Sequence, residues 1–241
     1  MNRDPYLYPD SDVLVNKLGI RDKDELAKRE SALVRLREPQ ASRLSGPMNL
    51  ERLHAVHKIL FSDVFEWAGT PRQNTGTMEK WRDGGYFVRY GDSAHVQAQL
   101  QIVFSDLAKE NYLKGLSADQ FANRLAHFYT ELDSVHCYRE GNSRTLRRFT
   151  ADLAKEAGHQ LNWSKAIATE ADRQKLYCAR DFGVMRGESN RLASIIGACL
   201  EGPVMERNAP DNDLEMERAA PTSKSAAKPK RARTKGQGID R

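Results

Sequence analysis

The sequence predicts a mainly α-helical fold that carries one β-hairpin. Between about residues 24 and 200, apolar residues recur every three or four positions in most segments, as on the buried face of a helix. One stretch, 72–91, breaks this pattern with several glycines and the β-prone run Tyr86-Phe87-Val88, which favours a hairpin. The chain of 241 residues is long enough for one domain with a hydrophobic core and a tail.

Capping and stop signals divide the chain into elements. Asn49 and Ser117 are typical helix N-caps, Pro39 stops the first helix, and Gly69 and Gly158 end later ones. In chain order we expect an N-terminal arm over 4–19, helices over 24–38 and 49–67, the hairpin over 72–91, helices over 93–110, from Ser117 to just before His136 and over 142–157, and two last helices over about 164–180 and 189–200.

The composition divides the chain into three parts. We expect residues 1–48 to be an arm and helix packed on the core, 49–202 to be the main domain, and 203–241 to be a disordered basic tail. Residues 218–241 hold eight Lys and Arg against one Asp, whereas the first 217 residues hold 30 basic against 32 acidic side chains. Because a DNA-binding domain normally carries positive charge on its own surface, nucleic acid is not the expected partner of the folded part.

The sequence predicts a cytoplasmic protein. Its N-terminus lacks an apolar stretch behind a basic start, so no secretory signal is expected. No segment approaches the ~20 uninterrupted apolar residues that span a bilayer. The three cysteines, Cys137, Cys178 and Cys199, have no paired spacing and fit reduced thiols better than a disulfide framework or a metal site.

The run from His136 to Arg147 has the parts of a phosphate-binding site. Gly141 and Asn142 can turn the chain into a new helix, whose free N–H groups and positive dipole end attract anions. Arg144 and Arg147 are three residues apart and therefore share a helix face. Two guanidinium groups at this place suit the outer phosphates of a nucleotide.

Two further side chains in the run suit phosphate chemistry. Glu140 is a hard carboxylate of the kind that holds Mg²⁺ on phosphates. His136 has an ordinary pKa near neutrality, which suits removal of a proton from a hydroxyl group. Each component also has a simpler explanation, because a histidine at a helix end often only partners the helix dipole and arginine pairs are usually solvated. Their occurrence within twelve residues favours the functional interpretation.

The run resembles the signature of the Fic family, His-x-Phe-x-(Asp/Glu)-Gly-Asn-Gly-Arg-x-x-Arg. The segments 4–9, 16–20 and 65–69 are also similar to bacterial Fic proteins, so the resemblance covers most of residues 4–200. It implies a mainly helical Fic fold in which the hairpin is a flap beside the active site. It also implies protein adenylyltransferase activity, in which AMP passes from ATP to a Tyr, Thr or Ser hydroxyl of a target protein.

The resemblance assigns a role to each residue of the run. His136 would take the proton of the target hydroxyl, and Glu140 would hold Mg²⁺ on the α- and β-phosphates. The flap would dock an extended segment of the target by strand addition. Within the flap, Phe87 either clamps the target or packs the hairpin onto the body. The expected ATP-binding residues are Gly141, Asn142 and Ser143, around the anion hole, and Arg144 and Arg147, at the outer phosphates.

The run departs from the signature at three positions. Tyr138 replaces the Phe that anchors the loop, and it fills that space if its hydroxyl finds a partner. Cys137 replaces a frequent Pro, and the mechanism needs no nucleophilic thiol. Ser143 replaces the second Gly, where a side chain could crowd the triphosphate and change nucleotide choice or rate. A weak or silent Fic-fold binding module, or transfer of a different nucleotide, is therefore the alternative function.

Many Fic proteins carry an inhibitory helix with the pattern (Ser/Thr)-x-x-x-Glu-(Gly/Asn), whose Glu pairs with the second Arg of the signature. This chain does not contain that pattern. By resemblance to toxin-like members, we expect a separate small antitoxin to supply the Glu to Arg147. The basic tail is then a solvated terminus, a segment that contacts nucleic acid non-specifically, or a signal for secretion into a host cell through a type IV system.

Overall fold

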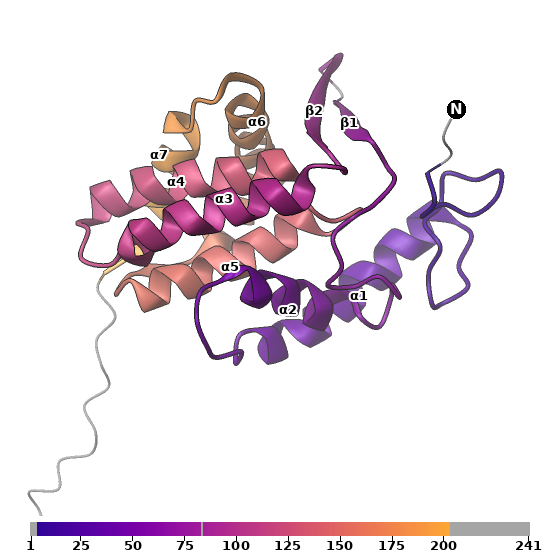
Figure 1. Cartoon of the computed structure of the whole chain (residues 1–241), viewed down its shortest axis with the longest axis horizontal. Coiled ribbons are helices and arrows are strands. Elements are labelled where there is room, and N and C mark those ends of the chain that lie inside the picture. The colour runs from indigo at the N-terminus through magenta and orange to yellow at the C-terminus, as the bar shows by residue number, and fades with distance from the viewer. Residues whose placement is uncertain (1–3, 83, 203–241) are drawn as a thin grey trace, which may run out of the picture. The chain divides into compact units, whose positions relative to one another are not determined.

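The computed structural model describes residues 4–82 and 84–202, so the expected tail over 203–241 lies outside the described residues. The described part belongs to one compact unit. Its helices are α1 (Lys23–Ala41), α2 (Leu50–Phe61), α3 (Val96–Lys109), η1 (Asn111–Leu113), α4 (Ala118–Val135), α5 (Asn142–Glu156), η2 (Trp163–Ile167), α6 (Glu170–Arg186) and α7 (Asn190–Cys199) (Figure 1). Its strands are β1 (Thr77–Arg82), β2 (Tyr86–Asp92), β3 (Gln160–Leu161) and β4 (Leu200–Glu201).

The prediction of a mainly helical fold with one hairpin is confirmed. β1 and β2 pair antiparallel, with a register shift between Thr77 and Glu79. A second pairing, between β3 and β4, is only two residues long and was not predicted. Pairs this short carry no periodic pattern that a sequence could display. In the described residues, no helix combines the length and the apolar character needed to cross a bilayer.

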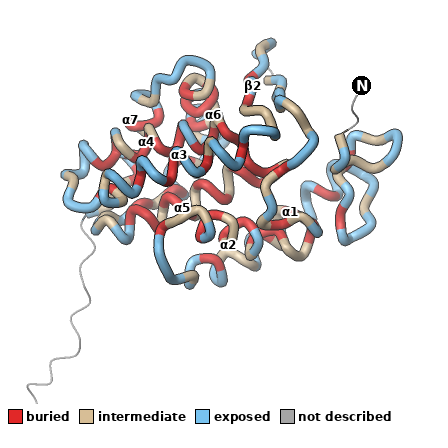
Figure 2. Tube along the Cα trace, in the orientation of Figure 1, coloured by how far each residue is buried: buried red, intermediate tan, exposed pale blue. Residues whose placement is uncertain are grey.

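Helix α4 is the centre of the larger hydrophobic cluster. It packs against α3, α5, α6 and α7, and a Ser117–Gln120 capping box begins it. Its residues Phe121, Leu125 and Tyr129 are four apart and fully buried. A second cluster joins α1, α2 and residues 64–68. Figure 2 shows the buried residues as bands along the inward faces of the helices.

Several helix ends differ from the predicted ones; among them, α3 begins at Val96 instead of residue 93, and α6 ends at Arg186 instead of about residue 180. α2 ends at Phe61 instead of Trp67, because residues 62–64 form a turn in which the Val64 N–H bonds the Phe61 carbonyl. α1 continues through Pro39 to Ala41, since a proline in the last turn costs only one hydrogen bond of the helix. α6 begins at Glu170, where Thr169 and Asp172 form a capping box that ends the separate turn of η2.

The N-terminal arm is tied to the segments around α2 and the hairpin. The Lys17 N–H donates to the Val64 carbonyl oxygen at 2.8 Å. The Tyr6 ring lies edge-on to Trp67, with 5.4 Å between the ring centroids. The Asp4 carboxylate accepts from Arg139 Nε at 2.6 Å, which joins the arm to the loop between α4 and α5.

A buried arginine connects the base of the hairpin to the end of α4. The side chain of Arg72 is 1% exposed, and its five N–H groups all find acceptors. Nε donates to the His136 carbonyl at 2.7 Å, and Nη1 donates to Thr75 Oγ1 at 2.7 Å and the Gly76 carbonyl at 2.8 Å. Nη2 donates to the carbonyls of Gly91 and Val135.

Replacement of this arginine is expected to destabilise the fold strongly. Arg72→Met removes a donor from four carbonyl oxygens, and the bonds to His136 and Val135 are fully buried, so we expect a loss of at least ~3 kcal/mol in the free energy of unfolding. Urea unfolding followed by circular dichroism measures it. Arg89→Met, on the same hairpin but 64% exposed, is the control and should change the free energy by less than ~0.5 kcal/mol. Equal midpoints for the two variants would contradict this account.

Candidate functional site

The loop between α4 and α5 has a conformation that few sequences allow. His136 ends α4 in the left-handed region, with φ 49° and ψ 58°. Gly141 precedes α5 with φ 82°, and a Cβ at this position would overlap the Phe61 ring. The Asn142 side chain closes the loop, because its Oδ1 accepts from the Tyr138 N–H at 2.9 Å and its Nδ2 donates to the Tyr138 carbonyl at 2.7 Å.

Tyr138 anchors the loop in the core. It is 1% exposed, and its ring stacks on His57 with 3.7 Å between the centroids. Its hydroxyl lies 2.8 Å from His54 Nδ1, so the partner that a buried tyrosine needs is present. Cys137 is also buried, and burial raises the pKa of its thiol to about 12. This thiol is therefore neutral at physiological pH, in line with the prediction that it is not a nucleophile.

The first turn of α5 opens into a cavity of about 970 Å³. The cavity is lined by α1, the hairpin, the loop between α4 and α5, the first turns of α5, the β3–η2 segment and α6. Eight cationic side chains line it against two carboxylates, Glu38 and Glu140. The cations are Arg35, Lys80, Arg82, Arg144, Arg147, Arg148, Arg173 and Arg180. Such an excess of positive charge beside free helix N–H groups makes the cavity an anion site.

His136 lies on the cavity wall as a neutral imidazole. Its side chain is 2% exposed and stacks on Tyr90, with 3.9 Å between the ring centroids. Burial and the charge of Lys80 lower the pKa of His136 to about 4, although Asp133, 3.7 Å from Nδ1, opposes the shift. Neither ring nitrogen has a hydrogen-bond partner within the described residues. One nitrogen is therefore free to accept a proton from a molecule in the cavity.

Glu140 presents an ionised carboxylate to the same cavity. Burial opposes ionisation, but Lys80, Arg144 and the Gly141 N–H together lower the pKa of Glu140 to about 2. One carboxylate oxygen accepts from the Gly141 N–H at 2.8 Å, and the side chain is 35% exposed. Among the described residues, no group of three or more His, Cys, Asp or Glu is arranged to hold a metal ion.

Arg144 is fixed between α1 and the loop. Its guanidinium pairs with the buried Glu30 of α1. It also lies 3.6 Å from Glu140 and over the Phe61 ring, at 4.9 Å from the centroid. The side chain remains 28% exposed, toward the cavity.

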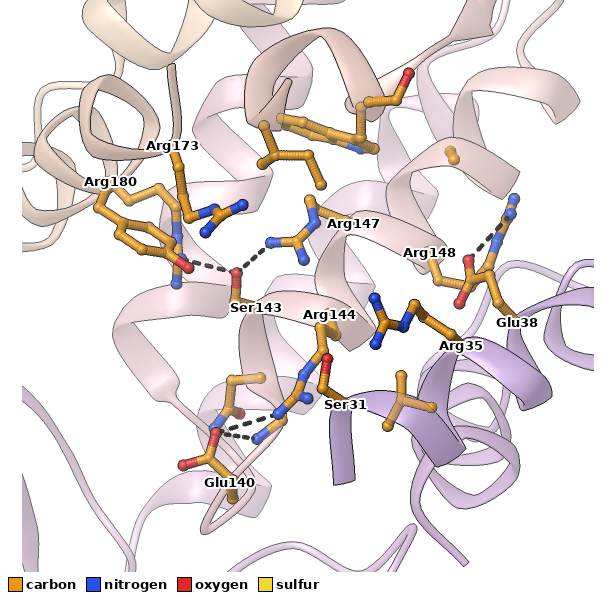
Figure 3. Close-up of a pocket in the computed structure, with 18 of the residues that line it drawn as sticks. Ser31, Arg35, Glu38, Glu140, Ser143, Arg144, Arg147, Arg148, Arg173 and Arg180 are labelled. Atoms are coloured by element: carbon orange, nitrogen blue, oxygen red, sulfur yellow. Dashed lines mark hydrogen bonds and ion pairs between the residues drawn. The ribbon is translucent and has the colours of Figure 1, made fainter. Parts of the chain in front are cut away.

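Arg147 and Arg180 converge on one hydroxyl oxygen. The Oγ of Ser143 accepts from Arg147 Nη1 at 2.6 Å and from Arg180 Nη1 at 2.9 Å, as Figure 3 shows. Arg180 is in turn held by Asp133, which accepts from its Nε at 3.0 Å and its Nη2 at 2.8 Å. Among the described residues, no carboxylate pairs with Arg147.

Comparison with known proteins assigns the chain to a family. The sequence profile of the Fic/DOC family matches residues 47–154. The chain is 35% identical over 195 residues to the probable protein adenylyltransferase Fic of Salmonella typhimurium, which covers 80% of this chain and 90% of that protein. The chain belongs to the Fic/DOC family. It is also 35% identical over 177 residues to the protein adenylyltransferase VbhT of Bartonella schoenbuchensis, which covers 73% of this chain but only 36% of VbhT. The chain thus spans about a third of that relative's length.

Solved structures share the Fic fold with this chain. The BepC effector of Bartonella tribocorum, solved with bound AMPPNP, has a TM-score of 0.71 at 24% identity and covers 84% of this chain and 98% of its own. The N-terminal Fic domain of a Bartonella quintana effector, solved with bound ADP, has a TM-score of 0.72 at 23% identity and covers 85% and 98%. At these identities the likeness establishes the fold.

The Fic motif residues predicted from the sequence gather around the cavity, whereas Phe87, the predicted residue outside the motif, does not line it. His136, Glu140 and the five residues expected to bind ATP all line it. Asn142 does so while its side-chain oxygen and one N–H of its amide group bond the Tyr138 backbone. Phe87 lies on the hairpin, 39% exposed, against Trp81 at 5.4 Å between centroids. It belongs to neither hydrophobic cluster of the body.

Sequence reasoning missed several residues of the site. Asp133 could have been found, because it lies one helical turn before His136 on the same face of α4. Glu30 and Arg180 could not, because their partners Arg144 and Asp133 lie 114 and 47 residues away along the chain. Lys80 gave no signal within the hairpin pattern, although its charge acts on both His136 and Glu140.

The close approach of Phe61 makes Gly141 irreplaceable, and a matched glycine can test this. Gly141→Ala must displace the Phe61 ring in addition to adopting a positive φ. Gly158 has nearly the same φ, +88°, and nothing within 4 Å of its would-be Cβ. We expect Gly158→Ala to lower the free energy of unfolding by ~1 kcal/mol and Gly141→Ala by a further ~1–3 kcal/mol. Chemical unfolding of both variants measures the difference, and equal losses would refute the steric explanation.

Proposed function

We propose that this chain is a protein adenylyltransferase that moves AMP from ATP to a Tyr, Thr or Ser hydroxyl of another protein. One observation carries the proposal: a free, neutral imidazole and the N-terminus of α5 open together into a cavity rich in arginine. The names of the Salmonella and Bartonella relatives support the reaction type. The AMPPNP and ADP in the two Bartonella effector structures support ATP as the donor.

In the proposed reaction, His136 is the general base. The target hydroxyl loses its proton to the free ring nitrogen while its oxygen attacks the α-phosphorus of ATP. The bond from the α-phosphorus to the bridging oxygen breaks, and pyrophosphate leaves with the electron pair. Burial serves this role, because it keeps His136 unprotonated at physiological pH. The Arg72 bond to the His136 carbonyl holds the imidazole at its place on the wall.

The first turn of α5 and its arginines hold the phosphates in this proposal. The backbone N–H groups around Gly141 and Ser143 bind the inner phosphate oxygens, with the helix dipole behind them. The first turn of α5 contains no acidic residue that would oppose this. Arg144 and Arg147 then bind the outer phosphates through charge-assisted hydrogen bonds.

Glu140 fits a role in holding Mg²⁺ with the nucleotide. Mg²⁺ is usually bound by one or two carboxylates together with substrate phosphates, and Glu140 is a single ionised carboxylate on the wall of the phosphate cavity. When bound, Mg²⁺ would neutralise charge that develops on the phosphates. Glu140 keeps one oxygen on the Gly141 N–H, which fixes the direction of the carboxylate.

The hairpin is the proposed docking site for the target protein. Trp81 is 72% and Phe87 39% exposed, as expected of side chains that await a partner. The bidentate pair of Arg82 with Asp181, at 2.7 and 2.6 Å, holds the hairpin against α6 at the edge of the cavity. An extended target segment along β1 would place its hydroxyl near His136.

We also propose that a separate small antitoxin restrains the enzyme in the cytoplasm, with secretion through a type IV system as the alternative location. Arg147 supports this, because its guanidinium is half-buried in the cavity and has no carboxylate partner among the described residues. An antitoxin glutamate would fill that gap and displace the outer phosphates.

Label transfer tests the proposed activity. The purified chain, Mg²⁺ and a bacterial lysate are incubated with ATP labelled at the α-phosphate or, in parallel, at the γ-phosphate. We expect label on a discrete protein from α-labelled ATP alone, since adenylyl transfer discards the γ-phosphate. His136→Ala should reduce labelling by ~10²–10⁴-fold, whereas His127→Ala, on the same helix but away from the cavity, should not. Transfer of γ-label would indicate a kinase, and no transfer from ATP, GTP, CTP or UTP would favour a silent binding module.

The pH dependence of the rate gives a second test. The lowered pKa of His136, about 4, means that the base is already neutral over the physiological range. Because kcat/KM reports ionisations of the free enzyme, its acid limb should be centred near pH 4 and the profile should be flat between about pH 6 and pH 8. The profile is measured at constant ionic strength. An acid limb near pH 6.5 would show that the imidazole titrates as if exposed to water.

Matched peptides test the proposed inhibition. A helical peptide with the pattern Ser-x-x-x-Glu-Gly should suppress labelling, because its carboxylate pairs with Arg147. The same peptide with Gln in place of Glu should suppress labelling at least ~10-fold less well, since it lacks the charge. Equal potency of the two peptides would mean that the charge on Arg147 is not the point of restraint.

A further inference from the structure

Arg180 is one of the arginines that reach the phosphate cavity from outside the Fic motif. Arg180 lies on α6, 33 residues beyond the last arginine of the motif, and its side chain is 7% exposed. It nevertheless lines the cavity together with Ser143 and Arg147. In Figure 3 it reaches Ser143 from α6, whereas Arg144 and Arg147 belong to α5 itself.

Asp133 fixes the direction of the Arg180 guanidinium. Both carboxylate oxygens accept from it, through Nε at 3.0 Å and Nη2 at 2.8 Å, and the carboxylate is 2% exposed. This parallel pair of bonds allows little rotation of the guanidinium plane. It leaves Nη1 as the nitrogen that points away from Asp133, with two N–H groups to donate.

Ser143 joins Arg180 to Arg147. Its Oγ accepts from Nη1 of each arginine, which sets the two guanidinium groups a fixed distance apart. Each Nη1 has two hydrogens and gives one to Ser143, so one donor on each side remains. A glycine at position 143, as in the family signature, offers no atom that could hold these two groups together.

The charge balance of this group calls for an anion. Asp133 pairs with Arg180, but in the described residues no carboxylate forms an ion pair with Arg147, and the charge of Glu38 acts on it only from a greater distance. Burial lowers the pKa of Arg147, and the nearby charge of Arg180 lowers it further. Two guanidinium groups held beside one hydroxyl in a half-buried place bind most strongly to a ligand with several negatively charged oxygens.

We propose that Arg180 is a third phosphate-binding residue and that Ser143, by spacing it from Arg147, makes the cavity selective for a triphosphate over a shorter phosphate chain. The inference rests on the proposed nucleotide site, but it concerns affinity and not transfer. Asp133 is a positioning residue in this arrangement, since it acts through Arg180. Ser143, the departure from the family signature, is then a specificity-determining residue.

Three variants test the contributions of Ser143, Arg180 and the Asp133–Arg180 pair separately. Ser143→Ala removes the shared oxygen at a half-buried helix position, where alanine is well tolerated. Arg180→Lys keeps the charge but loses the bidentate geometry. The double variant Asp133→Asn/Arg180→Gln removes both charges at once, so that no unpaired carboxylate is left buried. The control is Glu110→Gln/Arg124→Gln, a surface pair outside the cavity whose Arg124 Nε bonds Glu110 at 2.8 Å.

The measurement is the dissociation constant of ATP, ADP and AMP by titration calorimetry with the full chain in Mg²⁺. We expect the double variant to weaken ATP binding by ~10-fold or more, which corresponds to one charge-assisted hydrogen bond, and AMP binding by less than ~2-fold. Ser143→Ala and Arg180→Lys should lower the preference for ATP over AMP by ~3–10-fold. The control pair should leave all three constants unchanged.

Three results would overturn the proposal. These are unchanged ATP affinity in folded Ser143→Ala, equal losses for ATP and AMP, and no binding of ATP by the wild-type chain. If the double variant does not fold, as judged by circular dichroism, Ser143→Ala and Arg180→Lys decide. A wild-type chain that binds ATP but labels no protein would refute the proposed transfer. The proposed roles of Arg180 and Ser143 in phosphate binding would still be decided by the three dissociation constants.

Discussion

The structure depends on one buried guanidinium that three segments share. Arg72 donates to the last carbonyls of α4, to the chain before β1 and to the end of β2. Without these bonds the end of α4 would carry bare carbonyls in an apolar place, and the hairpin would have no fixed base. The same bonds hold His136 in its left-handed conformation, so the position of the proposed base and that of the hairpin are set together.

The charges around the cavity follow a common plan. Three arginines that face the ligand space are held from behind by carboxylates on other elements: Glu30 holds Arg144, Asp181 holds Arg82, and Asp133 holds Arg180. Side chains fixed in this way lose little conformational entropy when an anion binds, which favours affinity. The carboxylates also offset the repulsion between like charges in the empty cavity. Arg147 differs from these three, because within the described residues Ser143 and no carboxylate holds it, and we expect the greatest change on binding there.

Much of this could be predicted from the sequence. The helical periodicity predicted the order of the helices, Asn49 and Ser117 cap the helices they were expected to cap, and the catalytic, metal and ATP-binding residues expected between His136 and Arg147 line one cavity. Local signals were enough to predict these features, because a turn at a glycine with positive φ and the first turn of a helix both depend on residues that are adjacent in the sequence. The partners across the chain could not be predicted, since which carboxylate meets which arginine depends on how α1 and α6 pack. The ends of α1 and α2 could not be predicted for the same reason. Packing determined that α1 continues past Pro39 and that α2 ends at Phe61.

The two-stranded hairpin has a cost for the chain in solution. β2 packs against α4 and α6, so β1 is the outer strand, and no further described strand pairs with its edge. Open edges with exposed aromatic residues invite pairing between copies of a protein at high concentration. The irregular register near Thr77 and the charges of Glu79 and Arg89 shorten the regular, uncharged strand edge with which a second copy of the protein could pair. Strand β1 thus limits self-association, although its edge must remain unpaired to bind an extended segment of the proposed target protein.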